Sequence, residues 1–595
     1  MDYKKVEMNM DMNEILGKAQ AYIAAEKNGI FRTEIEELVA RDDYDELNER
    51  FYKELDFGTG GLRGEIGGGY NRMNSYTVSK ATQGLASYMV KNVNEEDRIA
   101  VISYDCRNFS DTFSEEAALV LAGNGIKTYL FTGLRPTPVL SFAVRELKAT
   151  AGIMVTASHN PAKYNGYKVF WNDGAQVTPP HDSGIIKEVR SVGDKIKKIS
   201  RDEAISRGLL VMIDSEVDES YEEMVVSQTL RPELVREKGK NLKIVYTPLH
   251  GAGNLPVNNA LRKMGIEVFT VPEQENPDGD FPTVAFPNPE ITEAMELALQ
   301  YGREEKADLI MGTDPDSDRL GIAVPENGDF RLISGNQLGA LLADYIFRTR
   351  KELGTLPPNG AFVNTIVTSD LQVKIAEAYG LEAFKVLTGF KYIGLKIREF
   401  EENNSHNYIF GGEESYGFLV GTAVRDKDAV SAATMTAEMA LWNVTQGRSI
   451  LDHLNEIYGK YGYYEETLIS NYFEGQQGAA IMDGLMARLR STPPESFGGI
   501  RISEIIDYKE GTTKVTQTGK VEKNIDLPPS NVLQFILEEG SLVTVRPSGT
   551  EPKIKFYASC CEKPGLELEK AKTGTAAKIK AIENQVRDMV SQAAE

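Results

Sequence analysis

The chain has 595 residues and a formal net charge of −22, from 66 Lys and Arg against 88 Asp and Glu. With 41% hydrophobic and 26% charged residues it has the composition of a globular protein, which argues against collagen, disorder and disulfide scaffolds. The excess of acid argues against nonspecific nucleic-acid binding, which needs a basic surface, and the length predicts about four domains.

Residues 1–56 are predicted to be helical and acidic, with 15 acidic and eight basic side chains. A glycine-rich break follows at 58–64. Beyond it, short apolar runs alternate with a helical pattern, which predicts three strands and a helix: Arg98–Tyr104, Thr128–Phe131 and Gly152–Thr156 as strands, and Ser114–Ala122 as the helix. Such alternation is typical of βαβ units and a mostly parallel sheet.

The same rhythm restarts twice. The predicted strands of these two blocks are Leu242–Thr247, Glu267–Val271 and Ala307–Met311, then Gly360–Val367, Phe384–Leu387 and Asn407–Phe410. The end of the chain differs, because a strand pair at 542–545 and 554–558 precedes a helix with one apolar stripe. We predict three successive α/β domains with mixed, mostly parallel sheets and a C-terminal α+β domain, over residues 1–211, 212–328, 329–470 and 471–595.

Cysteine usage indicates a reducing compartment. The three cysteines include the adjacent pair Cys560 and Cys561, and they form no CxxC pair, zinc spacing or disulfide framework. The first residues lack the apolar stretch of a signal peptide, and no run of about 18 uncharged apolar residues occurs. We therefore expect a cytoplasmic protein that has no membrane or nucleic-acid partner.

The first loop with chemical groups is Thr156–Pro161, directly after the apolar run GIMVT. Open α/β sheets bind ligands at the carboxyl ends of their strands, and Asn160-Pro161 forces a turn, so we expect Ser158 to be presented outward. A capped turn would explain the same residues, while a hydrolase serine lacks its GxSxG elbow. Ten residues on, Lys168 can return toward the same place.

The second loop, Gly312–Arg319, lies between the apolar runs ADLIM and LGIAV. Its aspartates Asp314, Asp316 and Asp318 stand at alternate positions without a nearby histidine or cysteine, which favours a hard cation such as Mg²⁺. An EF-hand does not fit, because position six of that loop would be Arg319 rather than glycine. A solvated acidic turn would leave three aligned carboxylates repelling one another.

The third loop, Gly411–Gly417, follows the apolar run NYIF. Glu413 and Ser415 can accept from and donate to neighbouring sugar hydroxyls, although a glycine-flanked acidic turn is the commoner meaning of such a pattern.

The fourth loop, Arg546–Lys553, offers a guanidinium, hydroxyls and loop amides, which are the groups of a phosphate site. A plain hairpin connection is its alternative.

Taken together, the four loops fall one in each predicted domain, so we expect all four domains to line one central cleft. A metal beside a serine, together with a separate phosphate anchor, indicates phosphoryl transfer.

The motifs TASHNP, GTDPDSDR, GGEESYG and RPSGTEPK, in this order, resemble those of the α-D-phosphohexomutase family. GTGGLRG at 58–64 is similar to the arginine loop of that family, and GGEESYGFLVG with VRDKDAVSA resembles the bacterial phosphoglucomutase branch related to phosphopentomutases. The resemblance extends from about residue 50 to the end. Ala429 is a departure, since glycine is usual there.

The resemblance implies that Ser158 is phosphorylated and that Mg²⁺ binds a phosphoserine oxygen of Ser158 with Asp314, Asp316 and Asp318. The implied basic residues around the transferring group are Arg63, His159, Lys168, Arg319 and Lys427. The implied substrate-binding residues are Thr388, Gly389, Lys391, Glu413 and Ser415 for the sugar, and Arg546, Ser548, Gly549 and Thr550 for the distal phosphate.

The implied activity is interconversion of glucose 1-phosphate and glucose 6-phosphate through glucose 1,6-bisphosphate, which also serves as activator. We expect Lys427 to be the general base, with Lys168 as second choice, since neighbouring cations would lower the pKa of a lysine toward 7. A phosphopentomutase, a phosphomannomutase and a Mg²⁺-dependent sugar phosphatase are the alternatives. The partner is a small phosphosugar; monomer and homodimer stay open, as does the role of residues 1–50.

Overall fold

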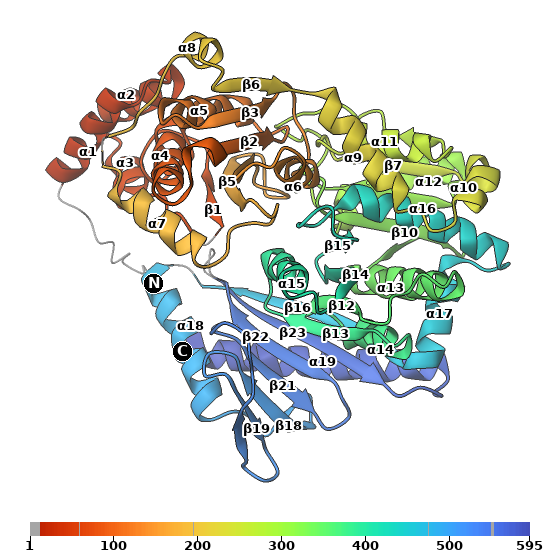
Figure 1. The fold of residues 1–595 in the computed structure, drawn as a ribbon. Helices are drawn as coiled ribbons and strands as arrows, with labels where there is room; N and C mark the ends of the chain where they lie inside the picture. The colour runs from red at the N-terminus through yellow and green to blue at the C-terminus, as the bar shows by residue number, and fades with distance from the viewer. Residues whose placement is uncertain (1–11, 59, 194, 474, 549–552, 595) are drawn as a thin grey trace. The chain divides into compact units, whose positions relative to one another are not determined.

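A computed structural model describes residues 12–594 apart from positions 59, 194, 474 and 549–552 (Figure 1). The chain divides into two compact units. The first contains the residues up to Ile333 together with 397–402 and 417–441, and the second contains 334–396, 403–416 and the chain from Trp442 onward. Two short segments from the middle of the sequence therefore belong to the first unit.

Three helices open the described chain: α1 (Met12–Ala25), α2 (Gly29–Ala40) and α3 (Tyr44–Phe51). The side chain of Asn28 accepts from Ile30 N and begins α2. The apolar faces of the helices form one small core around Tyr22 and Phe51, whose rings meet edge to face at 5.8 Å. Glu34 accepts from Gly68 N at 2.7 Å, so the helices pack on the chain that follows the glycine-rich break.

The first sheet has the strand order β1-β5-β4-β2-β3-β6. The strands β4, β2, β3 and β6 are parallel, and at one edge β5 pairs antiparallel with both β4 and β1. The strand bounds are β1 (Gly61–Glu65), β2 (Ile99–Tyr104), β3 (Lys127–Phe131), β4 (Ala151–Val155), β5 (Tyr164–Trp171) and β6 (Leu210–Ile213). The accompanying helices are α4 (Ser75–Asn92), η1 (Glu95–Asp97), α5 (Ser110–Gly123), α6 (Thr137–Glu146), α7 (His181–Ser191) and α8 (Arg201–Ser206).

The second sheet, also in the first unit, has the order β11-β10-β9-β7-β8. Parallel pairing of β9, β7 and β8 gives way to antiparallel pairing at β10 and β11. Its strands are β7 (Ile244–Thr247), β8 (Val268–Thr270), β9 (Leu309–Thr313), β10 (Leu320–Glu326) and β11 (Asp329–Ile333). Its helices are α9 (Ser215–Ser227), α10 (Pro232–Lys238), η2 (Gly239–Asn241), α11 (Asn254–Lys263) and α12 (Thr292–Glu305).

The third α/β block begins with α13 (Gly335–Glu352), where Ser334 and Gln337 form a capping box. Strand β12 (Gly360–Thr365) pairs in parallel with β13 (Glu382–Val386) and β14 (Asn407–Glu413). The other elements of this block are α14 (Asp370–Ala378), α15 (Phe390–Asn403), β15 (Gly417–Val420), α16 (Ala429–Thr445) and α17 (Ile450–Tyr461). Strand β15 and most of α16 lie in the segment that belongs to the first unit.

The last block is an antiparallel sheet in the order β16-β23-β22-β21-β18-β19-β20, with β17 paired to β18. Its strands are β16 (Tyr463–Tyr472), β17 (Ser496–Phe497), β18 (Ile500–Asp507), β19 (Thr512–Val515), β20 (Val521–Lys523), β21 (Leu533–Leu537), β22 (Leu542–Pro547) and β23 (Lys553–Glu562). Helices α18 (Gly475–Ser491) and α19 (Leu568–Ala594) complete it. Three α/β blocks followed by an α+β block confirm the predicted fold class.

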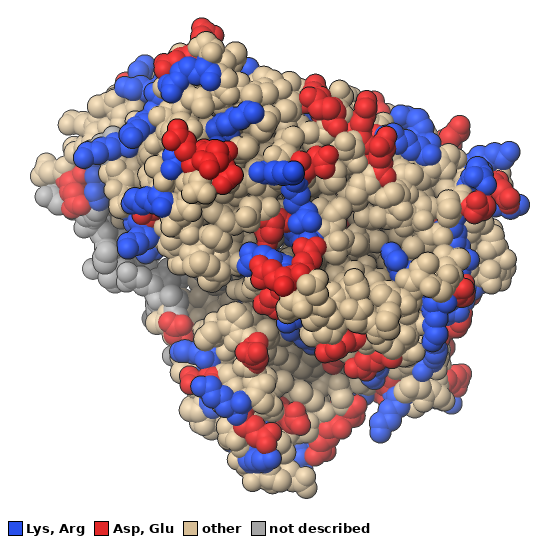
Figure 2. Space-filling view, viewed as in Figure 1, with Lys and Arg blue, Asp and Glu red and all other residues tan. Residues whose placement is uncertain are grey.

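Acidic and basic side chains are interspersed over the face drawn in Figure 2, so the net charge of −22 is not gathered into one patch there. Among the residues that the structure describes, no helix is both long enough and apolar enough to cross a membrane.

Candidate active site

Ser158 lies in the turn that follows β4. Its φ of +51° is a left-handed conformation that a non-glycine residue rarely adopts. Its backbone N–H donates to Thr156 Oγ1 at 2.8 Å, and its hydroxyl donates to Asp314 Oδ2 at 2.8 Å. The residue is only 4% exposed. The expectation that Ser158 is presented outward is therefore wrong, because this turn directs its side chain into a group of buried carboxylates.

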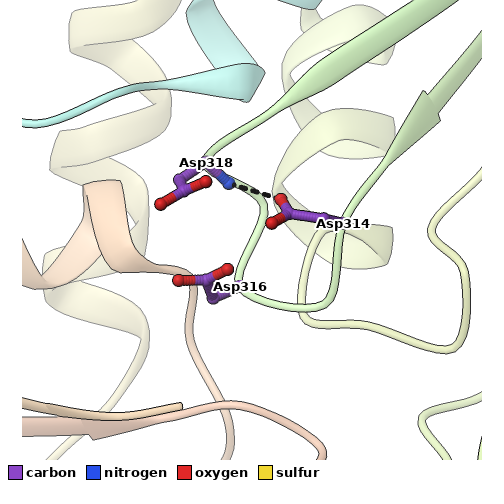
Figure 3. A group of neighbouring side chains, drawn as sticks. All are labelled: Asp314, Asp316 and Asp318. Carbon is purple, nitrogen blue, oxygen red and sulfur yellow. Dashed lines mark hydrogen bonds between the residues drawn. The ribbon is translucent and has the colours of Figure 1, made fainter. Parts of the chain in front are cut away.

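The three predicted metal-binding aspartates lie in the turn between β9 and β10 (Figure 3). Each offers a carboxylate oxygen, and these three oxygens lie within 4.8 Å of one another. The turn is fixed by Asp314 Oδ1, which accepts from the backbone N–H groups of Asp318 and Arg319 at 3.0 Å each. The antiparallel pairing of Thr313 with Leu320 closes the turn at its base.

These carboxylates fit a hard divalent cation. Asp316 Oδ1 and Asp318 Oδ1 are buried oxygens that accept no hydrogen bond from the described residues. Burial raises the pKa of Asp314 well above its ordinary value, and the charges of Asp318 and Asp316 raise it further. Three oxygen donors without sulfur or imidazole are the ligand set that Mg²⁺ prefers, and its charge would relieve their repulsion.

Asp316 also receives two donors from the first α/β block, one from the start of α6 and one from β5. Thr137 Oγ1 and Lys168 Nζ each donate to Asp316 Oδ2 at 2.7 Å. Burial alone would lower the pKa of Lys168, but the carboxylates of Asp316 and Asp318 outweigh it, so this pKa is raised. Lys168 thus returns to the site, but the expected lowering of its pKa is wrong.

Lys427 reaches the same aspartates from the chain between β15 and α16. Its Nζ lies 3.0 Å from Asp318 Oδ2 and 3.5 Å from Asp426 Oδ1. Asp426 Oδ2 accepts from Gln176 Nε2 at 2.8 Å. One residue beyond the lysine, Asp428 accepts from the buried hydroxyl of Tyr221 at 2.8 Å. Hydrogen bonds to neighbouring elements of the first unit therefore hold both sides of Lys427.

His159 and two arginines complete this group. His159 Nδ1 lies 3.2 Å from Ser158 Oγ. Burial lowers the pKa of His159 well below its ordinary value, and the positive charges of Arg319 and Arg63 lower it further. Arg319 forms an ion pair with Glu290, and Arg63 stands on β1 opposite Gly166 of β5. The imidazole is therefore neutral near pH 7.

In the second unit, the two predicted sugar-binding segments are joined by a hydrogen bond. Gly389 N–H, just before α15, donates to Glu413 Oε1 at 2.9 Å. Glu413 is buried as the last residue of β14, so the strand extends further into the predicted loop than NYIF. Thr388 Oγ1 is buried and makes no hydrogen bond to the described residues. Ser415 and Lys391 are both half-buried.

The predicted phosphate loop follows β22, which carries Arg546 opposite Lys555. Ser548 N–H donates to Lys553 O at 2.8 Å. Burial raises the pKa of Tyr557 on the next strand, while the charge of Arg546 opposes that rise. Gly549 and Thr550 lie outside the described residues.

Sequence reasoning missed Thr137 and Arg107. Thr137 uses both its hydroxyl and its backbone N–H on Asp316, the latter at 2.9 Å to the carbonyl oxygen. Arg107 is buried and donates to carbonyls of the Ser158 turn. Arg107 had a usable signal, because Asp105 and Arg107 are charged residues directly after the apolar strand β2.

Four domain models of the phosphoglucomutase/phosphomannomutase family match successive segments of the chain, in the order I to IV. Alpha/beta/alpha domain I matches residues 54–195, domain II 219–328, domain III 334–461 and the C-terminal domain 506–573.

Curated relatives match most of the chain. A phosphoglucomutase of Staphylococcus epidermidis is 37% identical over 533 residues, which cover 88% of this chain and 95% of the relative. A protein of Schizosaccharomyces pombe named as a probable phosphoribomutase is 36% identical over 554 residues, covering 90% and 92% of the two chains.

Solved structures share the fold at lower identity. The phosphoglucomutase parafusin of Paramecium has a TM-score of 0.65 at 18% identity, covering 91% of this chain and 95% of its own. A phosphoglucomutase/phosphomannomutase family protein of Burkholderia thailandensis also gives 0.65 at 18%, covering 91% and 98%. With four ordered domain matches and relatives above 35% identity along nearly the whole chain, the protein belongs to the phosphoglucomutase/phosphomannomutase family, the α-D-phosphohexomutases.

Proposed function

We propose that this enzyme interconverts α-D-glucose 1-phosphate and glucose 6-phosphate through a phosphorylated Ser158 and glucose 1,6-bisphosphate. The proposal is carried by one observation: the hydroxyl of Ser158 donates at 2.8 Å to Asp314, one of three carboxylates that fit a divalent cation. The 37% identity to a staphylococcal phosphoglucomutase supports glucose as the sugar.

Asp314, Asp316, Asp318 and an oxygen on Ser158 would hold the cation, which we assign as Mg²⁺. When bound, Mg²⁺ neutralises negative charge on the oxygens of the transferring phosphoryl group. Lys168 and Arg319 lie beside the same aspartates, where their positive charges would also stabilise the negative charge on the phosphoryl oxygens. Such electrostatic stabilisation is the usual basis of catalysis in phosphoryl transfer.

In the first half-reaction, a hydroxyl oxygen of glucose 1-phosphate attacks phosphorus on Ser158. The bond from phosphorus to Ser158 Oγ breaks, and glucose 1,6-bisphosphate forms. The proton of the sugar hydroxyl passes to a base, for which we propose Lys427. In the second half-reaction Ser158 Oγ attacks the other phosphate of the turned intermediate, the sugar oxygen regains a proton, and glucose 6-phosphate leaves.

The second unit supplies groups for the rest of the substrate. Glu413, fixed by Gly389 N–H, would accept from a sugar hydroxyl, with Ser415 and Lys391 nearby in sequence. Thr388 Oγ1 is buried without a hydrogen bond to the described residues, which supports a role in ligand binding because such groups are rare. We propose Arg546, Ser548, Gly549 and Thr550 as the site of the distal phosphate.

Replacing Ser158 by alanine tests the covalent scheme. Ser158→Ala should abolish mutase activity and the incorporation of labelled phosphate from glucose 1,6-bisphosphate. Ser103→Ala, which removes a buried hydroxyl from β2 of the same sheet, is the control and should keep both. Near wild-type turnover by Ser158→Ala would refute the scheme.

A pentose phosphate is the second candidate substrate, because the S. pombe relative at 36% identity is named a probable phosphoribomutase. The values of kcat/KM for glucose, mannose and ribose 1-phosphates should be compared with Mg²⁺ and a catalytic amount of glucose 1,6-bisphosphate. The highest value for glucose 1-phosphate is expected, whereas a higher value for ribose or mannose 1-phosphate would reassign the sugar. Release of inorganic phosphate without isomerised product would instead indicate a phosphatase.

A further inference from the structure

Arg107 gathers the carbonyl groups of the turn that carries Ser158. Its side chain is completely buried. Nη1 donates to Pro161 O and Tyr164 O at 3.0 Å each, and Nη2 donates to Ser158 O and Asn160 O. One guanidinium thus serves four carbonyls within seven consecutive residues, including the carbonyl of Ser158 itself.

Arg107 is itself held firmly. Its Nε lies 3.4 Å from Asp105 Oδ2, its backbone N–H donates to Asp105 Oδ1 at 3.0 Å, and its guanidinium lies over the Phe281 ring at 5.0 Å. Asp105 Oδ2 also accepts from Thr156 Oγ1 at 2.6 Å, and Thr156 Oγ1 accepts from Ser158 N. The pair Asp105 and Arg107 therefore fixes Ser158 through both its N–H and its carbonyl group.

This support matters because the turn has an unfavourable backbone conformation. Ser158 has a positive φ, which costs free energy unless the surroundings enforce it. Four carbonyl oxygens around one buried point would also repel one another without a donor between them. The planar fork of an arginine supplies several donors in fixed directions, whereas a lysine ammonium reaches fewer acceptors at once.

We propose that Arg107 is a positioning residue that aims the phosphoryl group on Ser158 at the sugar hydroxyl rather than at water. This inference rests on the proposed function. In transfer, the sugar oxygen attacks phosphorus, the bond to Ser158 Oγ breaks and the hydroxyl proton passes to a base. In the competing hydrolysis, water supplies the attacking oxygen, the same bond breaks, Ser158 Oγ takes a proton, and inorganic phosphate leaves.

The two reactions respond differently to a loosened turn. Transfer needs the sugar hydroxyl and phosphorus aligned, and a misplacement of about 1 Å costs roughly 10²-fold in rate. Water is small and needs no such alignment with the bound sugar. Loss of the arginine fork should therefore slow transfer much more than hydrolysis.

The test compares Arg107→Lys and Arg107→Met with Arg98→Lys. Arg98 directly precedes β2 and also donates to backbone carbonyls, those of Val93 and Val90 at 3.0 and 2.9 Å. These carbonyls do not belong to the Ser158 turn. Measured quantities are kcat and KM for glucose 1-phosphate, the release of labelled phosphate from the phosphorylated enzyme, and Tm. If the Arg107 variants fail to fold, Phe281→Leu replaces them, since it removes only the ring under the guanidinium.

We expect kcat of the Arg107 variants to fall about 10- to 100-fold with KM nearly unchanged, and the ratio of transfer to hydrolysis to fall at least about tenfold. Phe281→Leu should lower the same ratio less, and Arg98→Lys should leave it at the wild-type value. A ratio unchanged in the Arg107 variants, with only Tm lowered, would overturn the positioning role alone. Wild-type enzyme that takes up no phosphate on Ser158 would overturn the proposed function and this role with it.

Discussion

Lys427 Nζ lies 3.0 Å from Asp318 Oδ2, so a lysine of the third α/β block meets an aspartate of the second. The meeting depends on residues outside both loops. Gln176 donates to Asp426 and Tyr221 donates to Asp428, on either side of the lysine. These two hydrogen bonds hold the residues on either side of the lysine, and its positive charge offsets some of the repulsion among the carboxylates.

Removing one carboxylate should separate metal binding from folding. Asp318→Asn should lower kcat by about 10²-fold or more, because one oxygen ligand and its charge are lost. In EDTA its Tm should change little, since the substitution removes one of three crowded like charges but also the anionic partner of Lys427. The rise in Tm that Mg²⁺ causes in the wild type should shrink. Asp280→Asn, outside the group, is the control, and an undiminished Mg²⁺ effect in Asp318→Asn would refute the metal assignment.

The lowered pKa of His159 predicts a pH-dependent stability. The buried imidazole stays neutral in the folded protein, while in the unfolded chain it binds a proton below about pH 6.5. Unfolding is therefore favoured as the pH falls through 6.5. Between pH 7.5 and 5.5 the wild type should lose ~1 kcal/mol more of its free energy of unfolding than His159→Gln does. Denaturant titrations at the two pH values measure this, and equal losses, or an imidazole NMR signal titrating near pH 6.5, would contradict it.

For Glu466 on β16, in the second unit, we expect the opposite pH dependence of stability, a loss as the pH rises. Burial raises the pKa of Glu466 from 4.5 to about 7, aided by the charges of Glu465 and Asp370. The folded state holds this proton more tightly than the unfolded chain does, so stability is lost as the pH rises from about 4.5 to about 7.

Glu466→Gln should therefore gain ~1–2 kcal/mol in free energy of unfolding at pH 8, less than the full linkage value because the side chain is partly exposed. The gain should vanish near pH 4.5. Glu522→Gln on the exposed strand β20 controls for the loss of one negative charge. A gain that is equal at both pH values would show that the carboxyl does not titrate as proposed.

Gly61 allows β1 to lie close to β5, because a side chain at this position would collide with the backbone of β5. Its φ is +136°, and a Cβ there would lie 1.7 Å from Tyr167 O. Gly61→Ala should cost ~3 kcal/mol or more in free energy of unfolding and lower kcat at least about tenfold, because β1 carries Arg63. Gly125→Ala, also at positive φ but with nothing within 4 Å of the added Cβ, should cost ~1 kcal/mol and keep kcat. Equal effects of the two substitutions would show that Gly61 serves only its backbone conformation.

Local patterns predicted most of the strands. The run RIAVISY became β2 at Ile99–Tyr104 and LKIVYT became β7 at Ile244–Thr247, because buried parallel strands are continuous apolar runs. The aspartate group was also predictable, since three carboxylates at alternate positions in one short turn need no distant contact to come together. The domain boundaries and the single cleft stay predictions.

Other features depend on contacts between residues far apart in sequence. The burial of Ser158 requires Asp314, and the grip on its turn requires Arg107, neither of which periodicity can indicate. Likewise, the raised pKa of Lys168 arises from Asp316 and Asp318, whereas sequence reasoning weighed only neighbouring cations. Glu34, on the second of the helices within residues 12–51, accepts from Gly68 N just after the strand that carries Arg63, so these helices pack on the first α/β block.

The assignment of residues 417–441 to the first unit has a consequence for recombination. A hybrid that takes its whole third block from a relative would inherit a foreign Lys427 loop, and Gln176, Tyr221 and Asp318 would then have to match it. A hybrid that keeps this segment with the first two blocks would preserve those partners. We therefore expect substitutions within residues 417–441 to accompany substitutions in the first 333 residues, which belong to the same unit, rather than substitutions in their neighbours in sequence.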